Sequence, residues 1–316
     1  MRAVFLDFAT ASSGDLDVSP LRRLLPQLDL FDVTRDEEIA ARIHTAEVVL
    51  INKVSITAAA MEASPELRLI SLAATGTNNV DLEAARRLGI AVCNIRDYCT
   101  PSVMQHVFAT LLSLTHGLRE YERLAREEWA TSTQFTILRQ PIRELKGRSL
   151  GIVGFGVLGR AVARTAEAFE MRVLIANRPG GERKPGRFDL HDLLPQVDVL
   201  SLHCPLTAAT SGMIGARELS LMKPDAVIIN TARGALIDVE ALAQALRQRR
   251  IGGAAIDVLL QEPPRDGSPL LAPDLPNLIL TPHTAWAARE SRQRCLEEMA
   301  ANIEDFLRGG RRGRVV

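Results

Sequence analysis

Short apolar runs alternate with helical patterns of apolar and polar residues along the whole chain. In the first third, runs with the length of buried strands lie at residues 3–6, 28–33, 48–51, 69–73 and 90–93. The alternation restarts beyond residue 148, with runs at 150–153, 173–176, 199–202, 227–230, 254–258 and 278–281. Such alternation is typical of parallel sheets that carry helices on both faces. The pattern therefore predicts an α/β protein with two doubly wound parallel-sheet domains.

Three helical segments define the predicted domain organisation. Residues 82–88 form a helix that Asp81 caps and Gly89 ends. A long helix is predicted over about 101–128, and a last one over 289–307. The last helix comes too late for a sheet of its own, so we expect it to return to the first half. The predicted division is residues 1–98 with 288–316, and an inserted domain at 99–287.

The helix predicted over 101–128 has one apolar face at helical spacing. That face consists of Val103, Val107, Leu111, Leu114 and Leu118. A core or domain-bridging helix is the first interpretation of this face, and a subunit interface is the alternative.

A glycine-rich motif joins an apolar run to a helical pattern in the second half. The run at 149–153 leads into Gly154, Phe155, Gly156, Val157, Leu158 and Gly159, and a helical pattern follows over 160–169. A G-x-G-x-x-G motif between a strand and a helix is typical of dinucleotide binding, because the glycines permit a tight turn and a close backbone approach to pyrophosphate. The helix N-terminus then offers N–H groups to the phosphates. We therefore predict a dinucleotide site here.

The residues after the next strand bear on the choice of cofactor. An acidic residue there would accept hydrogen bonds from a ribose 2′-OH and select NAD. This sequence has Asn177 followed by Arg178 instead. A guanidinium suits a 2′-phosphate, so NADP(H) is favoured over NAD(H). Stacking of Arg178 on the adenine is the alternative, and it would suit either cofactor.

Arg233, Glu262 and His283 each follow a different predicted strand of the same sheet. Because ligands bind outside the carboxyl ends of such strands, we expect the three side chains to meet at one crevice with the glycine motif. Reduction of a 2-oxo acid needs a hydride, a proton and a cation for the carboxylate. A His donates the proton, a Glu favours its imidazolium form, and an Arg binds the carboxylate through a planar fork. Taken singly, each residue is more typical of a structural role, and only their joint placement predicts catalysis.

Composition narrows the possible partners. The chain has 316 residues, 47% hydrophobic and 24% charged, with a net charge of zero. This balance gives no electrostatic case for nucleic acid, and we expect the basic run at 308–314 to be a solvated tail. No signal peptide or membrane-spanning run is predicted. Cysteines 93, 99, 204 and 295 lack paired spacing, so we expect reduced thiols, no metal site and a cytoplasmic location.

Several segments together resemble the D-isomer-specific 2-hydroxyacid dehydrogenases over nearly the whole chain. The similar segments are 74–81, 151–159, 203–207, 230–234, 257–263 and 282–283. Asn78-Asn79-Val80, Lys53 and Trp286 are closest to the branch of glycerate dehydrogenases and hydroxypyruvate/glyoxylate reductases. The resemblance implies a Rossmann nucleotide-binding domain inserted in a flavodoxin-like substrate domain, which close on each other about hinges near 97–101 and 285–289. It also implies a homodimer joined through the helix that starts at Pro101.

The resemblance also implies roles for individual residues. Arg233 would bind the substrate carboxylate, Glu262 would be the acidic partner, and His283 would be the proton donor. The resemblance adds candidate substrate contacts at Lys53, Thr75, Gly76 and Trp286. It adds candidate cofactor contacts at Cys204, Pro205, Thr210, Thr231, Ala232, Asp257 and Ala285, and it counts Arg233 and His283 among the cofactor contacts as well. Asp257 would hold the nicotinamide carboxamide.

Two candidate substrate contacts keep an alternative, and one position departs from the family branch. Lys53 could equally face solvent at a strand end, and Trp286 could pack in the core. Thr77 stands where the branch often has an aromatic residue, which leaves the substrate less defined than the reaction. Among the remaining histidines, His106 and His116 are interpreted as packing or surface residues, whereas 44, 191 and 203 show no partner in the sequence.

The leading prediction is reduction of hydroxypyruvate or glyoxylate to D-glycerate or glycolate with NAD(P)H. A phosphoglycerate dehydrogenase-like enzyme is one alternative, which the lack of a strong phosphate site disfavours. Formate or phosphite oxidation is another, which the residues after His283 do not suggest. A nucleotide-sensing protein similar to the co-repressors of this fold would bind the cofactor and dimerise without vigorous turnover.

Overall fold

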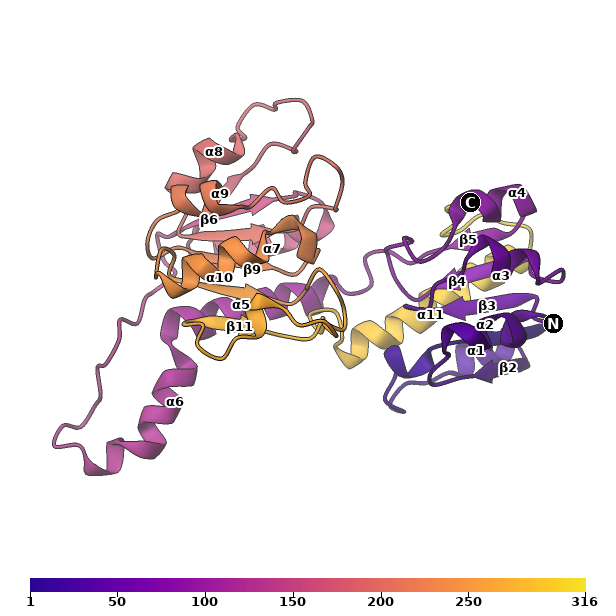
Figure 1. The fold of residues 1–316 in the computed structure, drawn as a ribbon, viewed down its shortest axis with the longest axis horizontal. Coiled ribbons are helices and arrows are strands. Elements are labelled where there is room, and N and C mark those ends of the chain that lie inside the picture. The colour runs from indigo at the N-terminus through magenta and orange to yellow at the C-terminus, as the bar shows by residue number, and fades with distance from the viewer. The chain divides into compact units, whose positions relative to one another are not determined.

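The computed structural model describes residues 1–316 and divides into two compact units (Figure 1). The first unit contains Met1–Cys99 and Trp286–Val316, and the second contains Thr100–Ala285. These boundaries lie within two residues of the expected ones. The chain therefore leaves the first unit once and returns to it for its last helix.

The first unit is built on a five-stranded parallel sheet in the order β2-β1-β3-β4-β5. Its strands are β1 (Arg2–Phe5), β2 (Gln27–Leu30), β3 (Val48–Ile51), β4 (Leu69–Leu72) and β5 (Ala91–Cys93). Strands β3 and β4 are buried at every position, because helices cover both faces of the sheet. This strand order is that of a flavodoxin-like sheet, the fold that the family resemblance implies.

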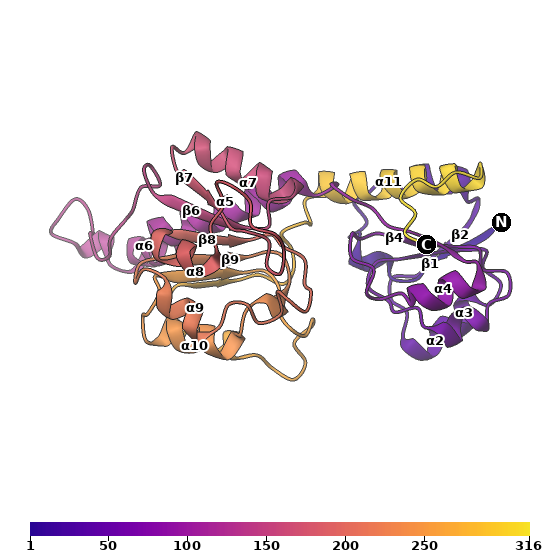
Figure 2. The same ribbon diagram turned by 90° about the horizontal axis from the view of Figure 1, so that it is seen from above.

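Helices form a layer on each face of the first sheet (Figure 2). The helices are α1 (Ser19–Leu24), α2 (Asp36–Ile43), α3 (Ala58–Glu62), α4 (Leu82–Leu88) and α11 (Arg289–Leu307). Helices α1 and α11 pack together over one face, and α2, α3 and α4 cover the other. The Asp81 side chain caps α4 by accepting from the Ala84 N–H, as predicted, and α11 has the predicted bounds.

The second unit is built on a six-stranded parallel sheet in the order β11-β10-β9-β8-β6-β7. Its strands are β6 (Ser149–Val153), β7 (Arg172–Ile175), β8 (Val199–Leu202), β9 (Val227–Asn230), β10 (Gly253–Ile256) and β11 (Leu278–Leu280). The direction of winding reverses between β6 and β8. Such a switch point is where an open α/β sheet binds its ligand, and the glycine motif lies directly after β6.

Helices also cover both faces of the second sheet. They are α5 (Thr100–His116), α7 (Val157–Ala168), α8 (Leu190–Leu193), α9 (Ala216–Leu221) and α10 (Val239–Arg247), together with the projecting α6 (Leu118–Glu127). Helices α5 and α7 pack together on one face, and α8, α9 and α10 lie on the other (Figure 2). The predicted fold class, two doubly wound parallel sheets, is confirmed.

The prediction of a single helix over 101–128 is wrong. Gly117 adopts a left-handed conformation, with φ of 60°, and separates α5 from α6. The predicted apolar face is buried at Val103, Val107, Leu111 and Leu114, whereas Leu118 is 54% exposed. Because the chain changes direction at Gly117, the apolar spacing no longer continues onto the same face.

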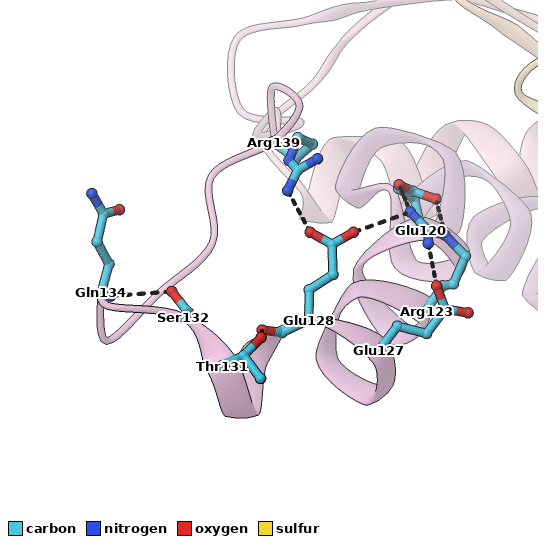
Figure 3. Close-up of polar contacts among 8 residues, drawn as sticks. All are labelled: Glu120, Arg123, Glu127, Glu128, Thr131, Ser132, Gln134 and Arg139. Carbon is cyan, nitrogen blue, oxygen red and sulfur yellow. Dashed lines mark hydrogen bonds and ion pairs between the residues drawn. The ribbon is translucent and has the colours of Figure 1, made fainter.

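Helix α6 and the segment after it form an arm, residues 118–142, that projects from the second sheet (Figure 1). Figure 3 shows the ion pairs that organise it: Arg123 pairs with Glu120 and Glu127, and Arg139 pairs with Glu128 at 2.5 Å. The segment after α6 carries large apolar side chains that are exposed. The exposed fraction is 89% for Phe135 and 81% for Leu138. The arm therefore carries exposed ion pairs together with large apolar side chains that are exposed.

The basic run at 308–314 is exposed at every position except Gly310, as expected, but its end is attached to the first sheet through backbone pairing. Arg314 forms an antiparallel bridge with Cys93, and the Val315 N–H donates to the Val92 carbonyl at 2.8 Å. The last residues thus pair with the open edge of β5. An exposed strand edge offers unpaired backbone groups, and the tail satisfies them here. In neither unit is any helix long and apolar enough to cross a membrane.

Candidate active site

The glycine motif forms the turn between β6 and α7. Gly154 has φ of 99°, and a Cβ at this position would collide with the backbone of His203 and Cys204. Gly156 stands at the N-cap of α7, and a Cβ there would meet no atom within 4 Å. The first glycine is therefore required by close packing inside the protein, whereas the second opens onto unfilled space at a helix N-terminus.

A cavity of about 440 Å³ lies between two loops of the same unit. Its lining consists of Arg178–Gly181 and residues 204, 205 and 207–210. Thr210 shapes this wall, since its hydroxyl donates to the Pro205 carbonyl at 2.8 Å. Thr231, at the end of β9, keeps a buried hydroxyl that has no hydrogen-bond partner within the protein. The space at Gly156, the cavity and this hydroxyl all lie in loops that follow the carboxyl ends of β6, β7, β8 and β9, where an open α/β sheet binds a dinucleotide.

The two residues that follow β8, His203 and Cys204, are neutral. Burial raises the pKa of the Cys204 thiol to about 11 and lowers the pKa of His203 to about 4. His203 bonds Ser201 Oγ through Nε2 at 2.8 Å, a partner that the sequence does not reveal. His191 also has a partner, Glu218 at 2.9 Å.

Arg233 sits on a turn that Asn230 holds. The buried Asn230 side chain donates to the Arg233 carbonyl at 2.8 Å and accepts from the Ala232 N–H at 3.0 Å. The Arg233 guanidinium donates to the Ala232 carbonyl at 2.6 Å, and the residue is exposed. A buried amide therefore fixes the backbone beneath an exposed cation.

The next loop packs directly against that turn. A Cβ on Gly234 would collide with the backbone of Leu259 and Leu260, so only glycine allows this approach. The Leu259 N–H donates to Glu262 Oε1 at 2.8 Å, and Glu262 Oε2 contacts His283 Nδ1 at 2.6 Å. The predicted contact between the carboxylate and the imidazole is present, next to the Arg233 turn.

Asp257 organises the turn that carries His283. Its buried carboxylate accepts from the Thr281 hydroxyl at 2.6 Å, the Thr284 N–H at 2.8 Å and the Ala285 N–H at 2.9 Å. The His283 N–H donates to the Asp257 carbonyl at 2.8 Å, and His283 has φ of 54°. Such a conformation is uncommon for a residue other than glycine and is sustained by surrounding contacts. Asp257 thus has a structural task besides the predicted contact with the nicotinamide carboxamide.

His106 lies beside the hydrogen bonds of Asp257, although the amino-acid sequence predicts only a packing or surface role for it. Its Nε2 lies 3.3 Å from Thr281 Oγ1 and 3.9 Å from Asp257 Oδ1. The sequence could not reveal this contact, because the residues lie more than 150 positions apart in the chain.

The candidate substrate residues of the first unit are held mainly through backbone groups. Asp7, buried after β1, accepts from the N–H groups of Asn52 at 2.8 Å, Lys53 at 2.5 Å and Val54 at 3.0 Å. The Lys53 side chain is exposed. Sequence reasoning missed Asp7, whose only signal is an acidic residue directly after an apolar run.

The other two candidate positions of this unit are a loop and an aromatic side chain. The loop containing Thr75 and Gly76 is held by Asn94, whose amide donates to the Thr75 carbonyl at 2.7 Å. Trp286 packs edge-on against Tyr98, with ring centroids 6.2 Å apart.

Comparison with known proteins decides the family. The family model described as D-isomer specific 2-hydroxyacid dehydrogenase, NAD binding domain, matches residues 108–285. The chain belongs to this family. The matched range contains the glycine motif, Arg233, Glu262 and His283.

Relatives of this dehydrogenase match over most of their length. Glycerate dehydrogenase of Methylorubrum extorquens is 45% identical over 274 residues, which is 86% of each chain. Hydroxypyruvate reductase of Blautia hydrogenotrophica is 35% identical over 316 residues, which is 98% of each chain. Among solved structures, the TT0316 protein from Thermus thermophilus superposes with a TM-score of 0.87 at 33% identity, and both chains are covered completely. The protein is therefore a nicotinamide-dependent oxidoreductase that acts on a CH–OH group.

Proposed function

We propose that this dehydrogenase reduces hydroxypyruvate or glyoxylate to D-glycerate or glycolate. The observation that carries the proposal is the 2.6 Å contact between Glu262 Oε2 and His283 Nδ1 beside the Arg233 turn. The names of its relatives, glycerate dehydrogenase and hydroxypyruvate reductase, support the choice of substrate, since hydroxypyruvate is the 2-oxo form of glycerate.

Each residue of this group has a proposed task. Because Glu262 engages Nδ1 of His283, the other ring nitrogen, Nε2, donates the proton to the carbonyl oxygen of the substrate. Glu262 fixes the ring orientation and compensates the charge of the imidazolium. Arg233 binds the substrate carboxylate through paired N–H donors and polarises the carbonyl. A bound reduced nicotinamide supplies the hydride to C2, so the hydride and the proton together convert the carbonyl to a hydroxyl.

The remaining candidate positions are proposed as binding residues. Residues 154–159 cradle the pyrophosphate, and Cys204, Pro205, Thr231, Ala232 and Ala285 line the dinucleotide site, with Thr210 supporting its wall. Lys53, the backbone at Thr75 and Gly76, and Trp286 contact the substrate. On this assignment the first unit is the substrate domain and the second is the nucleotide-binding domain.

NADP(H) is the proposed cofactor, with NAD(H) as the second choice. Neutral Asn177 stands two residues after the end of β7. Arg178 lines the cavity of about 440 Å³ and also a second cavity of about 390 Å³. A guanidinium at this place suits a 2′-phosphate by charge and by geometry.

We also propose a homodimer that is joined through α5 and the arm. The exposed side chains of Trp129, Phe135 and Leu138 support it, because large apolar side chains gathered on a projecting segment are typical of protein interfaces. The four cysteines are free, which supports a cytoplasmic location.

A turnover panel tests the function. Purified protein is mixed with NADPH or NADH and with hydroxypyruvate, glyoxylate, pyruvate or 2-oxobutyrate, and the absorbance of the reduced nicotinamide is followed. Fastest oxidation with hydroxypyruvate or glyoxylate is expected. Nucleotide binding without oxidation by any 2-oxo acid would replace the proposal with a nucleotide-sensing role.

A further inference from the structure

The loop between β7 and α8 closes on itself next to the proposed ribose position. Ala176 pairs with Phe188, and the Asn177 N–H donates to the Phe188 carbonyl at 2.7 Å. Residues 178–187 therefore leave the sheet and return to almost the same point. The loop carries four cationic residues, Arg178, Arg183, Lys184 and Arg187, and one acidic residue, Glu182.

Asp189 ends this loop and stands at the N-cap of α8. An aspartate in that position ordinarily accepts an N–H of the helix that follows. Here its side chain caps nothing: Oδ1 accepts from Asn177 Nδ2 at 2.9 Å, and Oδ2 pairs with Arg183. The carboxylate is thus turned away from its helix and toward the end of β7.

Asn177 links the loop to Asp189. Its Oδ1 accepts from the Lys184 N–H at 3.0 Å, while its Nδ2 donates to Asp189. A carboxylate at position 177 could not donate this bond and would repel Asp189. The carboxylate that lies beside position 177 is therefore that of Asp189, twelve residues further along the chain.

Asp189, Arg178 and Arg183 line one cavity, of about 390 Å³. The lining thus contains two guanidinium groups that suit a 2′-phosphate, and two carboxylates that oppose it, Asp189 and Glu218. Glu218 contacts His191 Nε2 at 2.9 Å, so Asp189 is the carboxylate that pairs with a guanidinium of the cavity. Arg183 is already paired with that carboxylate. A 2′-phosphate must therefore compete with Asp189 for Arg183, whereas a 2′-OH need not.

We propose that Asp189 is a specificity-determining residue for the cofactor, and that its charge limits the preference for NADP(H) that Arg178 creates. The inference rests on the proposed nicotinamide cofactor site at the end of β7. It assigns the acidic function of that site to Asp189 rather than to position 177.

The test measures binding and not turnover. Dissociation constants for NADPH, NADH, 2′,5′-ADP and 5′-AMP are determined by calorimetry with the full-length wild type and with Asp189→Asn. Asparagine keeps an acceptor for Asn177 and removes the charge. The variant should bind NADPH and 2′,5′-ADP about fivefold more tightly, the scale of one partly exposed charge interaction, and NADH and 5′-AMP within about twofold of wild type.

Glu182→Gln is the matched control, because Glu182 is exposed on the same loop and its loss changes the net charge equally. It should shift the NADPH affinity by less than about twofold, as expected for an exposed charge that does not line the cavity. Arg183→Gln is a second test, and it can be carried out even if the Asp189→Asn variant does not fold. It leaves the Asp189 charge uncompensated and should weaken NADPH and 2′,5′-ADP by about fivefold or more.

The possible failures are distinguishable. An unchanged ratio of NADPH affinity to NADH affinity in Asp189→Asn or in Arg183→Gln would overturn the role of Asp189. The role would also be overturned if Glu182→Gln changed this ratio as much as Asp189→Asn does. If the wild type bound neither dinucleotide, the proposed cofactor site itself would fail.

Discussion

The Arg233 turn of the second unit and the Lys53 loop of the first are both held by a buried polar side chain, but in different ways. Asn230 donates to one backbone group and accepts from another. Asp7 accepts from three consecutive N–H groups. The amide fixes a turn whose neighbours include a paired carboxylate and imidazole, whereas the carboxylate fixes the path of the backbone.

This difference suggests a division of labour. Near Arg233, the contacts with the backbone are accompanied by a contact between two titratable side chains, Glu262 and His283. Around Lys53, most of the fixed polar groups belong to the backbone. The first arrangement suits bond making and proton transfer, and the second suits recognition of substrate shape. Changes near Arg233 should therefore lower kcat, and changes near Lys53 should raise KM.

The largest expected effect is that of Arg233→Gln. The substrate carboxylate would lose its cation, so kcat/KM for hydroxypyruvate should fall about a thousandfold, in line with the 2–5 kcal/mol typical of a truncated charge pair. Steady-state kinetics check this, with the exposed Arg217→Gln as control. A loss below about fivefold would show that Arg233 is not the carboxylate ligand.

Gly156→Ala separates cofactor binding from folding. The added Cβ would meet no protein atom, so the melting temperature should stay unchanged. The affinity for NADPH should fall roughly tenfold or more, because an added methyl group in a tight contact costs about 1–3 kcal/mol. Gly215→Ala, at the N-cap of α9, also meets only an ordinary contact and should change neither quantity. An unchanged affinity for NADPH in Gly156→Ala would show that the pyrophosphate does not bind at this turn.

Asp7→Asn tests the recognition side of the comparison. The amide would place a donor against backbone N–H donors, at a cost of about 1–3 kcal/mol, and the Lys53 loop should shift. KM should rise about tenfold with kcat within about twofold of wild type, since the contact belongs to binding. Asp29→Asn, exposed on β2, is the control. A fall in kcat with KM unchanged would contradict the division between the two regions.

His203→Gln concerns stability alone and has the smallest expected effect. Burial lowers the pKa of His203 from 6.5 to about 4, so between these values the unfolded chain binds a proton that the folded protein does not. Stability should therefore fall as pH decreases from 6.5 to 4, and the variant should show a shallower fall. Denaturant unfolding at several pH values measures this slope. An equal slope in both proteins would exclude His203 as its source.

Much of the fold was predictable because it depends on local patterns. Each apolar run became a strand, and the cap at Asp81 acts as predicted. The break at Gly117 was missed because a single glycine within an apolar helical pattern is often tolerated. The pairing of Arg314 with Cys93 was missed because it joins positions distant in the chain.

The candidate site shows the same limit. The contact of Glu262 with His283 was predictable, since both follow strands of one parallel sheet. The support given by Asp7, Asn230 and Asp189 was not, because a polar residue at a strand or helix end predicts no particular partner. The sequence thus identifies the residues that could carry out the chemistry. The residues that position them are identified by the three-dimensional structure.

The most direct test is the turnover of His283→Ala measured together with its NADPH affinity, with the exposed His44→Ala as control. Loss of the general acid should lower kcat for hydroxypyruvate by about a hundredfold or more, while the dissociation constant of NADPH stays within about twofold of wild type. Unchanged kcat in a variant that still binds NADPH would show that this imidazole does not donate the proton.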